Sequence, residues 1–427
     1  MSVKKAIQDI ILWRGLNFLS VFIINVLLAR MLKAADAGAL FYFINNLSLL
    51  VLVLSFSLES SLSFFGANHK IKPGKLASLA IAWCIVASLL VGLIFQQLAA
   101  HIGDVTVTQP RTTAIFFIAG SLLVSFFSSL FFAEENFVLP NKLLLGINAV
   151  LIACLVAQRF NRMGIDQVLM AYFTAFLLQG IIIGLFFLLR QRGDRLQWPG
   201  VSEFRIILKY AAAAFLGNFI FFLVYRIDYW FVEIYCSAPE LGNYIQASKI
   251  VQWLLLPPMM ISSVLFPITA IGRDEAIRDK IITASRILFW LYLAGTILLA
   301  LFGRWIFPVV FGESFNMVYP VFVLLIPGIL ALATLYPVSA YNAGINQLGI
   351  NVRGSFYALV VIVVLNLLFT PVYGIYGAAI ASSIGYLVYF GFSFARFNRQ
   401  HQVALRSIFR PNLSDYRLLK SILERRQ

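Results

Sequence analysis

Charged residues are scarce in this sequence of 427 residues: they make up 12% of it, whereas a soluble domain averages about 25%. Hydrophobic residues make up 61% and the mean hydropathy is +0.89. Backbone polar groups in lipid must be satisfied internally, and the apolar runs lack the alternation of barrel strands. The composition therefore excludes a soluble globular protein and predicts an all-α integral membrane protein.

The sequence also lacks the residue patterns of several enzyme classes. It has no Walker loop, no Asp-x-Asp pair and no CxxC pair, and no long loop that could hold a catalytic domain. The three histidines fall in predicted loops or in the tail and are far apart: His69, His101 and His401. We therefore expect a protein that is not an enzyme, with no metal site, disulfide framework or cofactor.

What is present is a series of long apolar runs. A membrane-spanning helix needs about 20 predominantly apolar residues, and twelve runs approach or exceed that length. The predicted spans are 10–32, 37–58, 76–99, 112–133, 140–158, 168–190, 207–230, 241–267, 284–303, 318–341, 355–371 and 376–396.

Lysine and arginine are distributed unevenly between the two sides of the predicted bundle. When residues at the span ends are counted with the adjacent loop, the N-terminus, the even-numbered loops and the tail hold 24 of them and the odd-numbered loops hold 6; the remaining three, Arg14, Arg226 and Lys249, lie deeper within spans. Because cytoplasmic loops carry the excess of positive charge, both termini are predicted to be cytoplasmic. Most of the net charge of +15 is thus explained by the positive residues that set the orientation in the membrane. No folded basic domain is available to bind nucleic acid.

The first six spans are repeated by the second six, about 204 residues later. Asp36 and Gly38 at the first hairpin align with Glu240 and Gly242. Such repeats are common in secondary transporters, which bind substrate between the repeats. Four parts are expected: an N-terminal six-helix lobe at 1–192, a cytoplasmic linker at 193–206, a C-terminal six-helix lobe at 207–396 and a basic cytoplasmic tail at 397–427.

Polar residues within the spans are the candidates for a substrate site, because charges in the membrane usually face a water-filled interior. Arg14 and Asn17 share a helix face in the first span, and Asn218 is the repeat equivalent of Arg14. This partial polar stripe is typical of a cavity wall, and equally of a helix packed against its neighbours with satisfied polar groups.

Lys249 is the sharpest candidate. It lies about 12 Å into the eighth span at about 1.5 Å per residue, flanked by Gln246 and Gln252, and Asn45 is its repeat equivalent. At that depth it is expected to meet an anion of the substrate, or else a structural carboxylate such as Asp228.

Further charges lie near the ends of spans. Arg226 and Asp228 are two residues apart, so their side chains point in different directions on one helix, and each has a structural and a functional interpretation. Asp228 and Glu59 are the candidates for ion coupling, although Glu59 also fits an interfacial anchor. Prolines at 257–258, 267, 327 and 337 interrupt the eighth and tenth spans; such bends suit alternating access and, equally, static packing.

Several stretches together resemble the polysaccharide transporter family, the bacterial O-antigen and exopolysaccharide flippases. The resemblance runs from about residue 10 to 396, and its order and spacing are more specific than any one motif. One departure is Leu32-Lys33-Ala34, where the family usually has Leu-Gly-Pro. The matching stretches include Leu28-Ala29-Arg30-Met31-Leu32, Tyr225-Arg226-Ile227-Asp228, Phe311-Gly312-Glu313-Ser314-Phe315 and Pro371-Val372-Tyr373-Gly374.

The resemblance implies the fold of the multidrug/oligosaccharidyl-lipid/polysaccharide exporter superfamily, with two six-helix lobes around a central cavity. It implies a flippase in the bacterial inner membrane that moves undecaprenyl-pyrophosphate-linked glycans to the outer leaflet, with a polymerase and a chain-length regulator as possible partners. Lys249, Arg14 and Arg226 match a pyrophosphate chemically. The alternatives are a multidrug or cation exporter, which would favour intramembrane carboxylates, and a membrane polymerase, which would need a large outer loop. A peptidoglycan-precursor flippase usually has fourteen spans.

Overall fold

The computed structural model describes residues 3–102, 109–161, 165–191, 196–271, 275–404 and 406–410, and within them every regular element is a helix. Nine of the described helices are long and apolar enough to cross a membrane. The helices are α1 (Val3–Ser55), α2 (Leu58–Ala67), α3 (Pro73–Ile102), α4 (Pro110–Ala133), α5 (Val138–Asn161), α6 (Ile165–Arg190), α7 (Val201–Arg226), α8 (Asp228–Tyr235), α9 (Ala238–Leu254), α10 (Leu256–Ile271), α11 (Glu275–Phe311), the 3-10 helix η1 (Glu313–Phe315), α12 (Val318–Gly344), α13 (Leu348–His401) and α14 (Arg406–Phe409).

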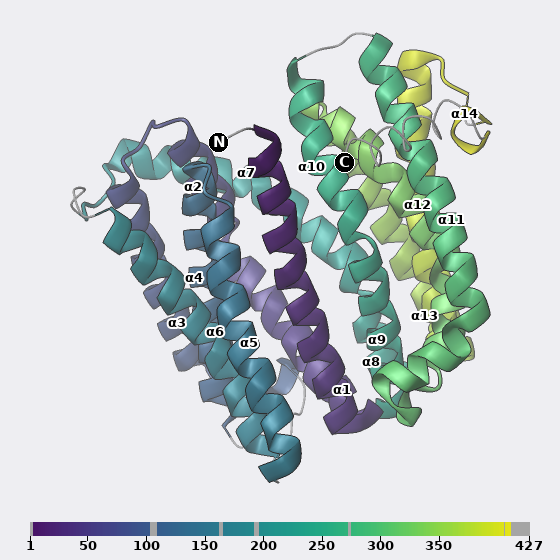
Figure 1. The fold of residues 1–427 in the computed structure, drawn as a ribbon, viewed down its shortest axis with the longest axis horizontal. Helices are drawn as coiled ribbons and strands as arrows, with labels where there is room; N and C mark the ends of the chain where they lie inside the picture. Colours follow the sequence, from purple (N-terminus) through teal and green to yellow (C-terminus); the bar gives the residue numbers. More distant parts are fainter. Residues whose placement is uncertain are drawn as a thin grey trace. The chain divides into compact units, whose positions relative to one another are not determined.

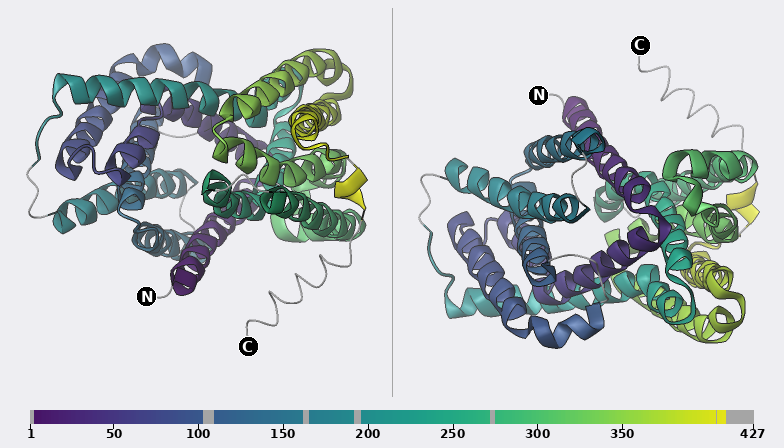
Figure 2. Two further views of the ribbon diagram at one scale, coloured as in Figure 1. Left: turned by 90° about the horizontal axis from the view of Figure 1, so that it is seen from above. Right: turned by 90° about the horizontal axis from the view of Figure 1, so that it is seen from below.

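The chain divides into two compact units, Met1–Phe219 and Ile220–Gln427. In unit 1, α4 packs on α3 and α6, and α1 packs on α5; in unit 2, α12 packs on α11 and α13 (Figure 1). The end-on views show each unit as a bundle of helices (Figure 2). The expected linker 193–206 falls in unit 1, its last residues already belong to α7, and the division lies later, within α7. The assignment of six-helix lobes stays a prediction.

The described helices are consistent with twelve spans, because several long helices contain a turn. Non-helical dihedral angles at Lys33 and Gly374 divide α1 and α13 into two segments each. The seventh span is built from α7 and α8, which are separated at Ile227, and the eighth from α9 and α10, which are separated at Leu255. Glycine has no Cβ, so Gly374 adopts its φ of 56° readily.

The repeat is visible at the first turn of each half. The turn at Lys33 corresponds, 204 residues later, to Ser237, where the chain passes from α8 to α9. Ser237 caps α9 in a capping box with Glu240, whose carboxylate accepts a hydrogen bond from the Ser237 backbone N–H at 2.8 Å. The acidic residue shared by the two hairpins therefore has a local structural role in the second.

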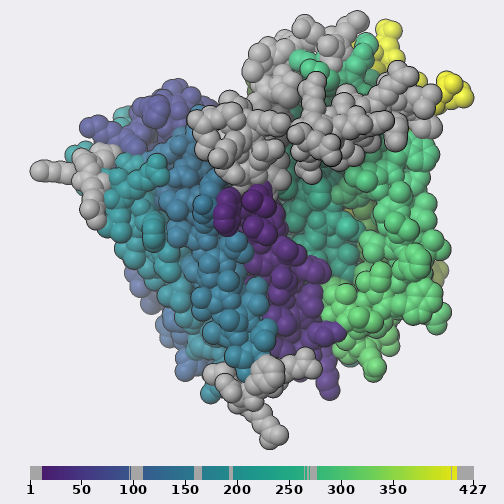
Figure 3. Space-filling view, in the orientation of Figure 1, coloured from purple at the N-terminus to yellow at the C-terminus, as the bar shows by residue number. Residues whose placement is uncertain are grey.

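Glycines allow close contact between α4 and α6 in unit 1. A Cβ on Gly120 of α4 would lie 2.2 Å from the carbonyl oxygen of Phe176 on α6, and a Cβ on Gly180 would lie 2.8 Å from the carbonyl oxygen of Gly120. Small residues allow the backbones of membrane helices to approach closely. The space-filling view shows a different contact of the same unit, where the visible part of α1 (purple) lies against α5 (blue) (Figure 3).

The proline pair of the eighth span coincides with a break in the helix. Helix α9 ends at Leu254, and Pro258 in α10 has no N–H to donate to the Leu254 carbonyl. The hydroxyl of Tyr292 on α11 donates to that carbonyl instead. By contrast, α12 continues as one helix through Pro327 and Pro337. Only the first of these proline sites interrupts the helix.

The first part of the expected basic tail packs on unit 2. Helix α13 extends to His401, and α14 lies against α11, where the Arg286 guanidinium donates to the Ser407 carbonyl at 2.9 Å. The ring of Phe409 packs edge-on against Phe289, with centroids 4.7 Å apart. Residues 411–427, with the remaining basic residues of the tail, lie outside the described part of the chain.

Candidate functional site

The break between α7 and α8 separates two charged side chains. Arg226 is the last residue of α7 and Asp228 the first of α8. The Arg226 guanidinium is half-buried and donates to the Gln252 side-chain oxygen at 3.2 Å, whereas Asp228 is only 1% exposed. The two side chains therefore have different surroundings, although they are two residues apart.

Asp228 is a buried carboxyl group with two donors on one oxygen. Its Oδ2 accepts hydrogen bonds from the hydroxyl of Tyr244 on α9 and, at 2.9 Å, from Ser382 on α13. Its Oδ1 is also buried, and none of the described residues donates a hydrogen bond to it. A buried carboxylate is costly unless its charge is compensated. This geometry suits a group that takes up and releases a proton or a small cation.

A chain of polar contacts runs from Arg226 into α9. The Gln252 amide that accepts from Arg226 donates to the Tyr229 hydroxyl at 3.3 Å, and that hydroxyl donates to Ser248 at 2.9 Å. Tyr229 is fully buried. These contacts link the Arg226 guanidinium to the first turn of α8 and the last turns of α9.

Lys249 lies on α9 beside this chain of contacts. It is half-buried, its neighbour Gln246 is fully buried, and its charge interacts repulsively with that of Arg226. Like charges repel each other more strongly in a partly desolvated place than they would in water. An anion bound between them would relieve that repulsion. Unit 2 thus gathers five of the predicted residues: Arg226, Asp228, Gln246, Lys249 and Gln252.

In unit 1, Asn17 belongs to an amide network that joins three helices. The Asn148 amide on α5 donates to the Asn17 side-chain oxygen at 3.1 Å and to Ser20 at 2.8 Å, and Gln179 on α6 donates to Asn148 at 2.7 Å. The sequence interpretation did not single out Asn148 and Gln179, although each is an amide side chain in an apolar span. Arg14, one turn before Asn17, is half-buried, with its guanidinium carbon 5.7 Å from the centre of the Phe18 ring.

A second polar cluster lies where α1 meets α2. Asn218 of α7 donates to the Ser57 hydroxyl at 3.0 Å, and the Ser57 backbone N–H donates to Ser55 at 3.1 Å. Glu59 follows in the first turn of α2, next to Ser55; its Oε2 is buried and has no hydrogen-bond partner among the described residues. Asn45, also in unit 1, is fully buried.

The backbone at this cluster is strained. Phe56 and Ser57 both have positive φ, 50° and 53°, and such conformations cost non-glycine residues about 1–3 kcal/mol each. Nothing in the residue types signals this, because neither residue is glycine or asparagine. The described residues contain no group of three or more His, Cys, Asp or Glu side chains that could hold a metal.

Comparison with known proteins gives consistent matches. Residues 4–271 match the sequence profile of the family described as polysaccharide biosynthesis protein. The chain is 22% identical over 404 residues to a probable low-salt glycan biosynthesis flippase, Agl15, of Haloferax volcanii; the alignment covers 91% of this chain and 80% of that protein.

Solved transporter structures share the fold. The lipid II flippase MurJ, in an inward closed conformation, has a TM-score of 0.74 at 12% identity, with 97% of this chain and 92% of that chain covered. A multidrug resistance MATE family transporter, in its inward-facing conformation, has a TM-score of 0.72 at 16% identity, with 90% and 94% covered. At these identities the likeness concerns the fold alone.

Proposed function

The chain belongs to the polysaccharide biosynthesis protein family, and from this membership we propose that it is a flippase for undecaprenyl-pyrophosphate-linked oligosaccharide repeat units. It is a multi-pass membrane protein and a polysaccharide transporter of the multidrug/oligosaccharidyl-lipid/polysaccharide exporter superfamily. The proposed movement is from the inner to the outer leaflet, by alternating access. The relatives that it matches are transporters, and we propose that this chain is likewise no enzyme.

The observation that carries the proposal is the pair of half-buried cations in unit 2. The charges of Arg226 and Lys249 repel each other. The Arg226 guanidinium donates to the Gln252 amide, which in turn contacts the Tyr229 hydroxyl. A pyrophosphate brings two phosphate groups, and guanidinium and ammonium groups are suited to both. Arg14, Asn17, Asn45 and Asn218 in unit 1, together with Gln246 and Gln252, complete the set proposed to contact the glycan lipid.

Ion coupling is proposed for Asp228 and Glu59. Each has a buried carboxyl oxygen without a hydrogen-bond partner among the described residues, so a proton or cation bound there would neutralise a costly charge. The energy source is then an ion gradient.

A multidrug or cation exporter is the second candidate function. It rests on the shared fold with the MATE transporter. An organic cation needs an accessible carboxylate, however, and Asp228 is 1% exposed with two donors on one oxygen. A polysaccharide polymerase is a weaker candidate, since the loops are short.

The proposed setting is the bacterial inner membrane, with both termini in the cytoplasm and a polymerase and chain-length regulator as partners. Deletion of the gene tests the proposal: we expect surface polysaccharide to disappear and the lipid-linked repeat unit to accumulate on the cytoplasmic side. Complementation with the full chain should restore both. Normal polymer in the deletion strain, with increased drug sensitivity, would instead favour the exporter.

A further inference from the structure

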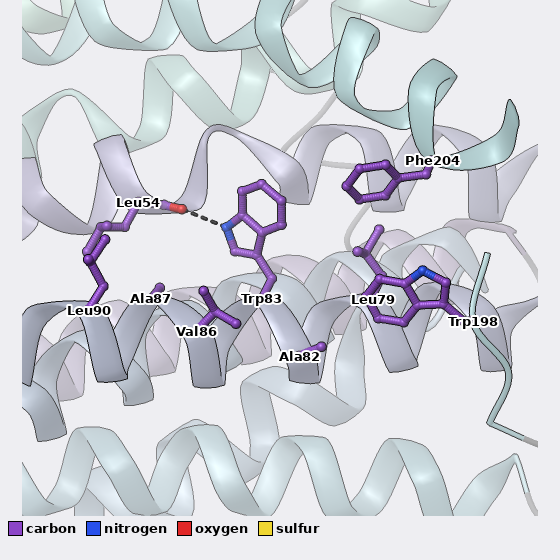
Figure 4. A pocket seen from close by; sticks show the side chains of 9 residues that line it. All are labelled: Leu54, Leu79, Ala82, Trp83, Val86, Ala87, Leu90, Trp198 and Phe204. Atoms are coloured by element: carbon purple, nitrogen blue, oxygen red, sulfur yellow. Dashed lines mark hydrogen bonds between the residues drawn. The ribbon is translucent and has the colours of Figure 1, made fainter. Parts of the chain in front are cut away.

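An elongated apolar crevice lies within unit 1. Its volume is about 240 Å³, and it is enclosed by the end of α1, one face of α3, the start of α7 and the chain segment before α7 (Figure 4). All nine lining side chains are apolar or tryptophan; those used below are Leu54, Leu79, Trp83, Leu90, Trp198 and Phe204.

The crevice extends along α3 for about the depth of one membrane leaflet. The lining residues of α3 recur every three or four positions from Leu79 to Leu90, which places them on one face. Eleven residues at about 1.5 Å each span about 16 Å, and half of the hydrocarbon core is about 15 Å. Figure 4 shows Leu90 at one end of the row and Leu79, Trp198 and Phe204 at the other.

Of the two indole N–H groups drawn in Figure 4, that of Trp83 has a partner within the wall. The Trp83 indole donates to the Leu54 carbonyl at 2.7 Å, near the end of α1 where the helical hydrogen bonding stops. The crevice therefore offers an occupant apolar surface and no unsatisfied donor from that side chain. A hydrocarbon chain fits such a lining, and a polar solute does not.

Basic residues lie close in sequence to the elements that form the end of the crevice at Trp198. Lys75, one turn before Leu79 on α3, forms a salt bridge with Glu203 at 2.8 Å, which neutralises the acidic group there. Lys70 and Lys72 precede α3, and Arg205 directly follows the lining residue Phe204 on α7; all three are exposed. Trp198 is 60% exposed, as is common for tryptophan at the membrane interface. The charge count of the sequence predicts this end to be cytoplasmic.

We propose that the crevice binds one acyl chain of an anionic phospholipid from the cytoplasmic leaflet, with the phosphate near Lys70, Lys72 and Arg205. The positive charge at the mouth complements an anionic headgroup. The length of the crevice matches one acyl chain in one leaflet, which is the reason for choosing a phospholipid over a longer polyprenyl tail. The bound lipid stabilises the contacts among α1, α3 and α7 and is separate from the transported glycan lipid.

The test uses the full chain, purified in detergent and stripped of lipid, with thermal unfolding as the readout. We expect phosphatidylglycerol to raise the melting temperature more than phosphatidylcholine does. Ala82→Phe, which fills the crevice, should abolish the phosphatidylglycerol effect. Lys70→Gln combined with Lys72→Gln should reduce it to the phosphatidylcholine level. Val150→Phe, at an exposed apolar position on α5, is the matched control and should respond like the wild type.

Three results would overturn the proposal: equal stabilisation of the wild type by both lipids, an undiminished effect in Ala82→Phe, or loss of the effect in Val150→Phe. Mass spectrometry of lipids retained through purification adds a second readout. We expect anionic phospholipid in the wild type and less of it in Ala82→Phe. If the wild type instead retained a polyprenyl phosphate and Ala82→Phe did not, the crevice would bind the tail of the substrate. Because none of these readouts involves transport, they are independent of the flippase proposal.

Discussion

At the scale of single residues, unit 2 holds opposite kinds of charge in different surroundings. Arg226 and Lys249 are half-buried cations that repel each other, while Asp228 is buried against hydroxyl groups. Cations that remain partly accessible can exchange partners with a passing substrate. A carboxyl group held by two donors is suited to a ligand as small as a proton or metal ion.

We expect Lys249→Ala to abolish complementation of the deletion strain at unchanged membrane levels, because it removes one of the two cations proposed for the pyrophosphate. Lys249→Arg keeps the charge and should be milder. Lys280→Ala, at an exposed position of α11, is the matched control and should behave as wild type. The measurement is surface polysaccharide together with immunoblots of the membrane fraction. Full activity of the alanine variant would remove Lys249 from the site.

Asp228→Asn tests ion coupling with little change in shape. The amide oxygen can still accept from Tyr244 and Ser382, so the melting temperature should change little while transport is lost. Asp228→Ala leaves both donors unpaired and should lower the free energy of unfolding by about 1–3 kcal/mol per donor. Ser382→Ala retains the carboxylate and should retain transport. Polysaccharide export by the asparagine variant at the wild-type level would rule out a coupling role for Asp228.

At the scale of elements, the helices are interrupted at positions where the backbone is unusual. Lys33 has φ 60° and ψ −178°, a region almost restricted to glycine. It is also the position at which the chain departs from the Leu-Gly-Pro of the family that it resembles. The chain therefore forms the turn between the first two spans although lysine, and not glycine, occupies this position.

Lys33→Gly is expected to stabilise the protein, because glycine removes the steric conflict of Cβ at this φ. Relief of such strain is worth about 1–3 kcal/mol, less the entropy that glycine loses on folding. Arg30→Gly, one turn earlier in regular helix, is the control and should destabilise by about 1 kcal/mol. Thermal unfolding in detergent measures both. A lower melting temperature for Lys33→Gly would mean that the lysine side chain stabilises the protein by more than the backbone strain destabilises it.

At the scale of the whole molecule, orientation in the membrane depends on the predicted charge asymmetry, and Cys236 can test it. This cysteine lies between α8 and α9, at a turn predicted to face outward. Burial, with a smaller contribution from Glu240, raises the pKa of its thiol to about 11. The thiol is thus mostly protonated and unreactive at neutral pH.

In a variant with Cys84 and Cys154 replaced by serine, we expect a membrane-impermeant maleimide to label Cys236 slowly on intact cells at pH 7. Between pH 7 and the pKa, the labelling rate should rise about tenfold per pH unit, because the fraction of thiolate rises by that factor. Gln197→Cys in the same variant, with Cys236 also replaced, should label only after permeabilisation. If Cys236 were labelled only in permeabilised cells, the topology would be inverted.

The sequence by itself determined the class of the protein, its helices and the charged residues that are candidates for the site. Apolar runs of about 20 residues in lipid form helices, because their backbone polar groups must be satisfied within the segment. A lysine or arginine in such a run can be identified directly from the sequence. The sequence also placed the repeated turn, since its residue types recur 204 positions later. The order and spacing of several weak motifs indicated the family to which the chain belongs.

Only the tertiary structure decided which groups meet. Tyr244 and Ser382 are distant in sequence from Asp228, and a hydroxyl in a membrane helix is too common to signal a contact. The amides of Asn148 and Gln179, the strained turn at Phe56 and Ser57, and the apolar crevice beside Trp83 depend on how helices pack. Periodicity fixes the face on which a side chain lies, whereas its partner is set by the neighbouring helix that covers this face.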